Sequence, residues 1–120
     1  MKILTTAIAT ILMLATVAQA ENIVELTTSQ ASSHVGENAT VCGKVVGGYY
    51  ASRSNGEPTF LNLDKAYPNQ KFTIVIWGDD RYQFNNPETK YNGKKVCVTG
   101  YIDSYRGIPQ IVAENPSQIR

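Results

Sequence analysis

The sequence predicts an all-β domain: a five-stranded Greek-key barrel with a short helix between the third and fourth strands and a short N-terminal helix. Three observations support this. Five short segments alternate apolar and polar residues, the period of a half-buried strand. Segments rich in glycine, proline, asparagine and aspartate separate them. Two cysteines, Cys42 and Cys97, occupy outward positions in two of these segments.

The first twenty residues have the features of a secretory signal peptide. Lys2 gives a positive start, an apolar run follows, and residues 18–20 read Ala-Gln-Ala, a cleavage signal. The apolar run is short for a membrane span. We therefore expect residues 1–20 to be removed and residues 21–120 to form one periplasmic or secreted domain that does not associate with a membrane. The alternative is an uncleaved N-terminal anchor.

The first elements of the mature chain are a helix and a strand. Residues 27–35 predict a short helix that Thr28 or Ser29 can cap and Gly36 can end. Residues 40–46 predict the first strand, because their inward positions alternate with polar ones. The inward residues of this strand are Val41, Gly43 and Val45.

The pair Gly47-Gly48 predicts the end of that strand. Tyr49, Tyr50 and Arg53 would then lie on the loop to the next strand. The alternative is that the two glycines let the strand coil sharply around the barrel, as at a β-bulge.

The second and third strands are predicted over residues 58–64 and 71–77, with a turn at residues 66–70. Their inward residues are Leu61, Leu63, Phe72, Ile74 and Ile76. After the third strand, Asp79 or Asp80 can cap a short helix that ends after Phe84, before Asn85-Asn86-Pro87.

The last two strands are predicted over residues 95–102 and 108–113, joined by a tight turn at residues 103–107. Val96, Val98 and Ile102 are the inward residues of the fourth strand. Pro109 indicates either that the fifth strand lies at the edge of the sheet or that Pro109 lies at the start of the strand. Ile119, in the C-terminal tail, is expected to pack against the core.

Five short strands with a helix between the third and fourth form the layout of the OB-fold. In that barrel the first and fourth strands are antiparallel neighbours, so the outward Cys42 and Cys97 can form a disulfide. The bridge would close a loop of about 55 residues, worth roughly 4 kcal/mol in the chain-entropy model. A metal or redox pair would need closer spacing or further ligands, and His34 is distant from both cysteines in sequence.

The ending V-x-V-T-G-x-I…Y-x-G-x-P-x-I, from Val96 to Ile111, carries a family likeness. Together with the run that begins TVCGKVVGGYYASRSNG, it makes residues 36–119 resemble small secreted bacterial OB-fold domains of the nucleic-acid-binding, tRNA-anticodon-binding type. The resemblance implies the fold more strongly than the ligand, because OB-folds serve many partners. Relatives of this kind also occur beside nuclease domains, which implies an accessory module with a nuclease or another envelope protein as its partner.

OB-folds bind single strands on the face of the second and third strands and on the 1-2 and 4-5 loops. Aromatic rings stack on bases there, and cations neutralise phosphates. The candidate nucleic-acid-binding residues are Tyr49, Tyr50, Arg53, Phe60, Asn62, Lys71, Trp77, Tyr105 and Arg106. We therefore predict a binding module for single-stranded DNA or RNA.

Several of these residues have a structural alternative. Tyr49 and Tyr50 can cover one end of the barrel, residues 105–107 can be only a hairpin turn, and Trp77 can pack against the following helix. The second hypothesis is accordingly an envelope domain that binds a protein or a small ligand and no nucleic acid. The formal net charge of only +1, which Lys2 accounts for, favours this alternative.

An enzyme is not expected. Asp79 and Asp80 are adjacent, so their side chains diverge instead of sharing a proton. His34 lies in a serine-rich segment with no nucleophile at a diagnostic spacing. The sequence contains no phosphate loop and no metal-ligand cluster, so we expect neither a metal nor a cofactor.

Overall fold

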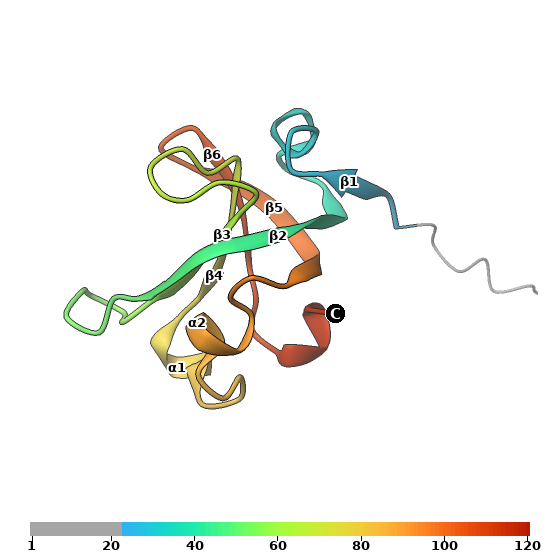
Figure 1. The fold of residues 1–120 in the computed structure, drawn as a ribbon. Coiled ribbons are helices and arrows are strands. Elements are labelled where there is room, and N and C mark those ends of the chain that lie inside the picture. Colours follow the sequence, from blue (N-terminus) through green and yellow to red (C-terminus); the bar gives the residue numbers. More distant parts are fainter. Residues whose placement is uncertain (1–22) are drawn as a thin grey trace, which may run out of the picture.

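The computed structural model describes residues 23–120 and shows a ring of strands with short helices at its ends (Figure 1). Five strands pair in the order β2 (Asn38–Tyr50), β3 (Thr59–Leu63), β4 (Phe72–Ile76), β6 (Ile108–Val112) and β5 (Lys95–Tyr105). β5 then pairs with β2, so hydrogen bonding closes the ring. The all-β prediction is confirmed. The predicted signal peptide, residues 1–20, lies outside the described residues.

The predicted count of five strands is wrong, because β1 (Glu25–Thr27) adds a sixth. β1 pairs in parallel with β2, with Leu26 opposite Val41. Leu26 is the one buried residue of β1, and three residues are too few to show an alternating pattern. The helix predicted over residues 27–35 is a shorter 3-10 helix, η1 (Ala31–His34).

Two short helices, and not one, connect β4 to β5: α1 (Gly78–Arg81) and α2 (Pro87–Lys90). Asp79 and Asp80 lie inside the first turn of α1 after the N-cap residue Trp77, so the prediction that one of them caps the helix is wrong. Pro87 begins a helix, although the sequence predicted that this segment ends one. Proline suits the first helical position because its φ is already helical and because an N–H at that position would have no partner within the helix.

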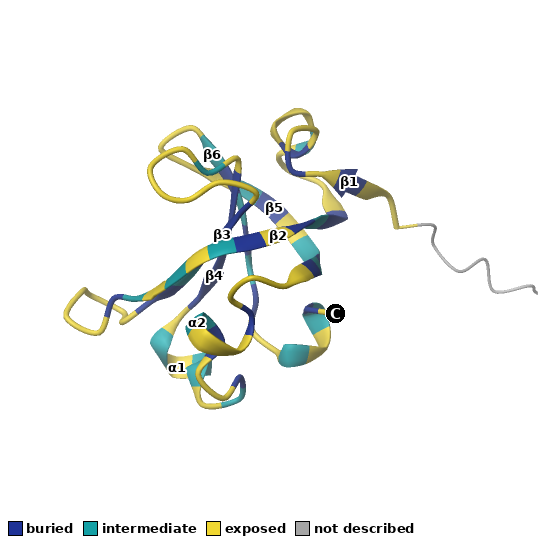
Figure 2. Ribbon diagram, in the orientation of Figure 1, coloured by how far each residue is buried: buried dark blue, intermediate teal, exposed yellow. Residues whose placement is uncertain are grey.

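The core fills the inside of the ring, where buried residues follow the strands while loops and helix surfaces are mostly exposed (Figure 2). All the apolar side chains predicted to face inward are buried: Val41, Val45, Leu61, Leu63, Phe72, Ile74, Ile76, Val96, Val98 and Ile102. The tail prediction is also confirmed, because Ile119 is buried and forms a β-bridge with Val98. Full burial stabilises the fold by roughly 1.5–3 kcal/mol for each large apolar side chain.

β2 continues through the two glycines, so the predicted break is wrong and Tyr50 is the last residue of the strand. The pairing register with β3 shifts between Val45 and Gly48, which marks a bulge. Gly47 has φ +85°, which favours glycine. Gly48 lies against α2, where an added Cβ would come within 2.7 Å of the Glu88 Cα.

β5 also extends farther than predicted and ends at Tyr105, which pairs with Ile108 of β6. Only Arg106 and Gly107 form the turn, with φ values of +50° and +80°. Two positive φ values in a two-residue hairpin match the right-handed twist of the strands. Pro109 is the second residue of β6, which pairs with both β4 and β5, so the edge-strand prediction is wrong and the strand-start alternative holds.

Asp64 joins two strands that share one edge of β2. Its backbone N–H donates to the Lys44 carbonyl (2.7 Å), and its carboxylate accepts from the Lys44 N–H (2.9 Å) and from the Thr28 hydroxyl. Gly43 leaves room for this contact, because a Cβ there would lie 2.9 Å from the Thr28 methyl group. β1, Asp64 and β3 therefore cover that edge of β2 one after another.

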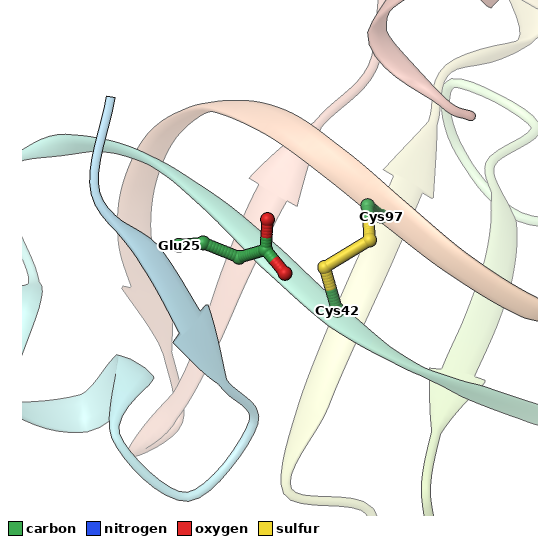
Figure 3. Close-up of side chains that lie close together, drawn as sticks. All are labelled: Glu25, Cys42 and Cys97. Carbon is green, nitrogen blue, oxygen red and sulfur yellow. A yellow bond between two sulfur atoms is a disulfide. The ribbon is translucent and has the colours of Figure 1, made fainter. Parts of the chain in front are cut away.

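The disulfide prediction is confirmed. Cys42 and Cys97 are direct partners on β2 and β5, their Cα atoms are 4.0 Å apart and their sulfurs are bonded. Figure 3 shows the Glu25 carboxylate of β1 beside this bond. The three residues form the one group of potential metal ligands within residues 23–120, but bonded sulfurs are not thiolates and do not hold a metal.

Candidate nucleic-acid interface

A groove of 670 Å³ lies where β3, β4 and β6 meet the end of β2 and two loops. The loop between β3 and β4 and the turn between β5 and β6 both line it, and Figure 1 shows them close together. We call it the aromatic groove, after its four rings: Tyr49, Phe60, Tyr67 and Tyr105. Arg106 is its one cation, and no carboxylate lines it.

The pairing register of the strands determines which side chains lie next to one another on the floor of the groove. Tyr49 of β2 is paired with Phe60 of β3. Asn62, Thr73 and Gln110 form a row across β3, β4 and β6, because Asn62 pairs with Thr73 and Thr73 pairs with Gln110. The groove therefore has an aromatic pair beside a row of amide and hydroxyl groups.

Three tyrosine rings at the groove are unusually open to solvent. The exposed fractions are 64% for Tyr49, 77% for Tyr67 and 60% for Tyr105. The Arg106 guanidinium lies 5.3 Å from the centre of the Tyr105 ring, within the range of a cation–π contact. Flat rings presented to water beside a cation provide a surface on which a planar, electron-rich group can stack.

Two polar groups of the groove differ in how their hydrogen bonds are satisfied. Asn62 is buried, and its amide donates to the Gly47 carbonyl at the bulge (3.3 Å). The Gln70 side-chain oxygen is also buried but has no hydrogen-bond partner among the described residues. A buried acceptor without a partner costs free energy. A ligand N–H or O–H at this position would supply the missing donor.

Tyr50 was a predicted binding residue, but it faces the helices and does not line the aromatic groove. The Arg81 guanidinium lies 3.7 Å from the centre of its ring. Arg81 also donates to both carboxylate oxygens of Glu88, at 2.6 and 2.8 Å, and to the Thr59 hydroxyl. These hydrogen bonds lower the pKa of Glu88 and raise that of Arg81. Tyr50 is therefore part of a structural cluster that holds the helices.

Three other predicted residues also lie outside the aromatic groove. The Trp77 ring packs on the loop before β3, because a Cβ on Gly56 would lie 2.9 Å from its Cε3. Arg53 is exposed on that same loop. Lys71 is exposed just before β4 and lines a second, adjoining groove. Of the nine predicted residues, the structure brings together Tyr49, Phe60, Asn62, Tyr105 and Arg106.

Sequence reasoning missed the residues that complete the groove: Tyr67, Pro68, Gln70, Thr73, Ile108 and Gln110. Tyr67 is the most exposed ring of the groove, and an aromatic residue in a turn beside the second and third strands was an available signal. Thr73 and Gln110 occupy outward positions of strands that the alternation had already predicted. Gln110 was missed because the outward set was not extended to the fifth strand, whereas Thr73 lies between Lys71 and Trp77 on the outward face of the third predicted strand and was passed over.

Comparisons with known proteins support the fold. No family model matches the chain, and no curated protein matches it. A crystal structure of yeast Stn1 and Ten1 is similar, with a TM-score of 0.57, 15% identity and coverage of 84% of this chain and 63% of the other. A protein described as an aspartyl-tRNA synthetase from Leishmania major Friedlin has a TM-score of 0.53 and 8% identity, with 79% and 20% covered. This chain thus spans less than two thirds of either protein, and the likeness supports an OB-like fold.

Proposed function

We propose that this protein is an exported OB-fold module that binds single-stranded nucleic acid in the aromatic groove. One observation carries the proposal. Four aromatic rings and one arginine from three strands and two loops converge on a groove that no carboxylate lines. Stacking surfaces with a cation and without negative charge are what a single strand requires.

Each part of the groove has a role in this binding. Bases stack on Tyr49, Tyr67 and Tyr105, and each stack contributes about 1–3 kcal/mol. Arg106 contacts a phosphate beside the base that lies on Tyr105. Base edges reach the Gln70 oxygen and the Gln110 amide. Stacking tolerates every base, so we expect weak sequence preference.

Two further observations are consistent with the proposal. One structure of similar fold is a tRNA synthetase by name, and so a protein that acts on RNA. The disulfide between Cys42 and Cys97 is compatible with an oxidising compartment outside the cytoplasm.

Within residues 23–120 no helix is long and apolar enough to cross a membrane. In this proposal the module binds and does not catalyse, and a nuclease or another envelope protein would act on the bound strand.

A second candidate is a domain that binds a protein or small ligand in the same groove. The single cation of the aromatic groove favours it, because a strand with several phosphates usually meets several cations. The two candidates differ in salt dependence. Affinity for a nucleic acid falls with salt concentration, whereas affinity for a neutral ligand changes little.

The test is fluorescence anisotropy of a labelled twelve-nucleotide single strand at 20–200 mM salt. We expect Tyr105→Ala and Tyr67→Ala to weaken binding roughly 5- to 100-fold. Tyr82→Ala is the matched control, because Tyr82 is 84% exposed and lies outside the aromatic groove. If the protein binds the labelled strand at low salt no more tightly than an unrelated neutral protein does, the proposal is overturned. Equal losses in all three variants would also overturn it.

A further inference from the structure

A second groove continues the aromatic one. It has a volume of 390 Å³ and shares Pro68, Gln70 and Ile108 with the aromatic groove, so the two are continuous. Its other side is formed by the segment around η1, which packs against β6. We call this second groove the polar extension. It carries no aromatic ring, and its accessible polar groups are those of Ser29, Ser32, Asn69 and Lys71.

The two parts of the groove differ in chemistry as the base and the phosphate of a nucleotide do. The aromatic groove offers rings for bases but only Arg106 for phosphates. The polar extension offers hydroxyl and amide donors with the Lys71 ammonium group. No lysine of residues 23–120 forms an ion pair, so Lys71 keeps its charge free for a phosphate. Hydroxyl and ammonium donors are common partners of phosphate oxygens.

We propose that a bound strand passes from the aromatic groove between Pro68 and Ile108 onto the polar extension, where Lys71 contacts its backbone phosphate. This inference rests on the proposed function and extends it. It assigns the segment around η1, which is not part of the five-strand ring, a role in ligand binding. It also predicts that affinity depends on strand length, because only a strand longer than the aromatic groove reaches Lys71.

The test uses oligodeoxythymidylates of two, four, six and eight nucleotides with the full chain. Lys71→Ala should weaken binding of the eight-nucleotide strand roughly fivefold at low salt and reduce the slope of log affinity against log salt by about one unit. It should leave binding of the two-nucleotide strand unchanged. The Ser29→Ala/Ser32→Ala double variant should follow the same length dependence, with a smaller effect.

Lys65→Ala is the matched control, because Lys65 is an exposed lysine on the same loop that lines neither groove. It should bind strands of every length as the wild type does. Lys71→Ala should also melt at the wild-type temperature, since Lys71 is exposed and makes no ion pair.

The outcomes separate this inference from the proposed function. If strands bind and Tyr105→Ala weakens them, but Lys71→Ala behaves like Lys65→Ala at every length, the polar extension is not used and only this inference fails. Equal losses for two and eight nucleotides would also overturn it, because Lys71 would then act at the aromatic groove or through charge alone. If no strand binds at all, the proposed function fails as well.

Discussion

The cluster around Arg81 predicts a large cost for a single substitution. Arg81 makes two hydrogen bonds to Glu88 and one to Thr59, and its guanidinium covers the Tyr50 ring. The side chains of Arg81 and Glu88 are only 15% and 22% exposed, so solvent screens the pair weakly. Hydrogen bonds to charged groups contribute about 1.5–3 kcal/mol and a cation–π contact about 1 kcal/mol. Arg81→Ala should therefore lower the free energy of unfolding by about 3 kcal/mol.

Urea unfolding at pH 7, followed by tryptophan fluorescence, measures this loss. Arg53→Ala is the control, because Arg53 is exposed on a neighbouring loop and should change stability by less than about 0.5 kcal/mol. An Arg81→Ala variant within about 0.5 kcal/mol of the wild type would show that the cluster contributes little, and the reasoning would be wrong.

The same cluster predicts a pH dependence. Arg81 lowers the pKa of Glu88 in the folded state, so the folded state binds fewer protons than the unfolded state at acidic pH. The stabilisation is therefore complete above about pH 4.5 and is lost as the pH falls through the folded pKa. The stability difference between the wild type and Glu88→Gln should shrink over that range. A constant difference from pH 7 to pH 3 would contradict this.

Gly48→Ala should lower the free energy of unfolding by about 1–3 kcal/mol, because its Cβ would lie 2.7 Å from the backbone of α2. Gly47→Ala has open space and should cost only about 1–2 kcal/mol through its positive φ, so the larger loss in urea unfolding should belong to Gly48. Replacing Cys42 and Cys97 with alanine should lower the free energy of unfolding by up to about 4 kcal/mol, whereas two alkylatable thiols in the wild-type protein would refute the disulfide. Burial raises the pKa of Tyr91, so its phenol should ionise late in an ultraviolet titration, and stability should fall as the pH rises above about 10. Tyr91→Phe should remove that late step, and an unchanged titration curve would contradict the assignment.

The ring of strands could be predicted because its physical signal is local. Side chains alternate between core and solvent, so Leu61 and Leu63, or Val96 and Val98, fix the inward face of a strand before any partner is known. The disulfide followed from the same parity, since it requires two outward cysteines on neighbouring strands. β1 could not be predicted, because a three-residue strand is selected by its tertiary contact with β2.

The candidate site was predicted only in part, because the direction of a side chain at a strand end depends on what packs there. Tyr49 and Tyr50 look alike in sequence, but the strand directs Tyr49 to the groove, and Tyr50 lies under Arg81. A pair of glycines predicts a chain break as readily as a bulge, and only the pairing of Gly48 with Leu61 of β3 decides between them. Tyr67 was missed because its turn places it at the groove through tertiary structure and not through alternation.

The covered edge of β2 has a consequence for behaviour at high concentration. A bare strand edge presents unpaired N–H and C=O groups on which another chain can add, and this is a common start of aggregation. In this protein β1, Asp64 and β3 occupy that edge in turn, and β5 occupies the opposite one. Within residues 23–120, the ring therefore leaves the outer side of β1 as its principal free edge, only three residues long and bearing the charged Glu25. Such a short, charged template disfavours intermolecular sheet growth, so a strand-rich domain of this size can remain monodisperse without a separate protective element.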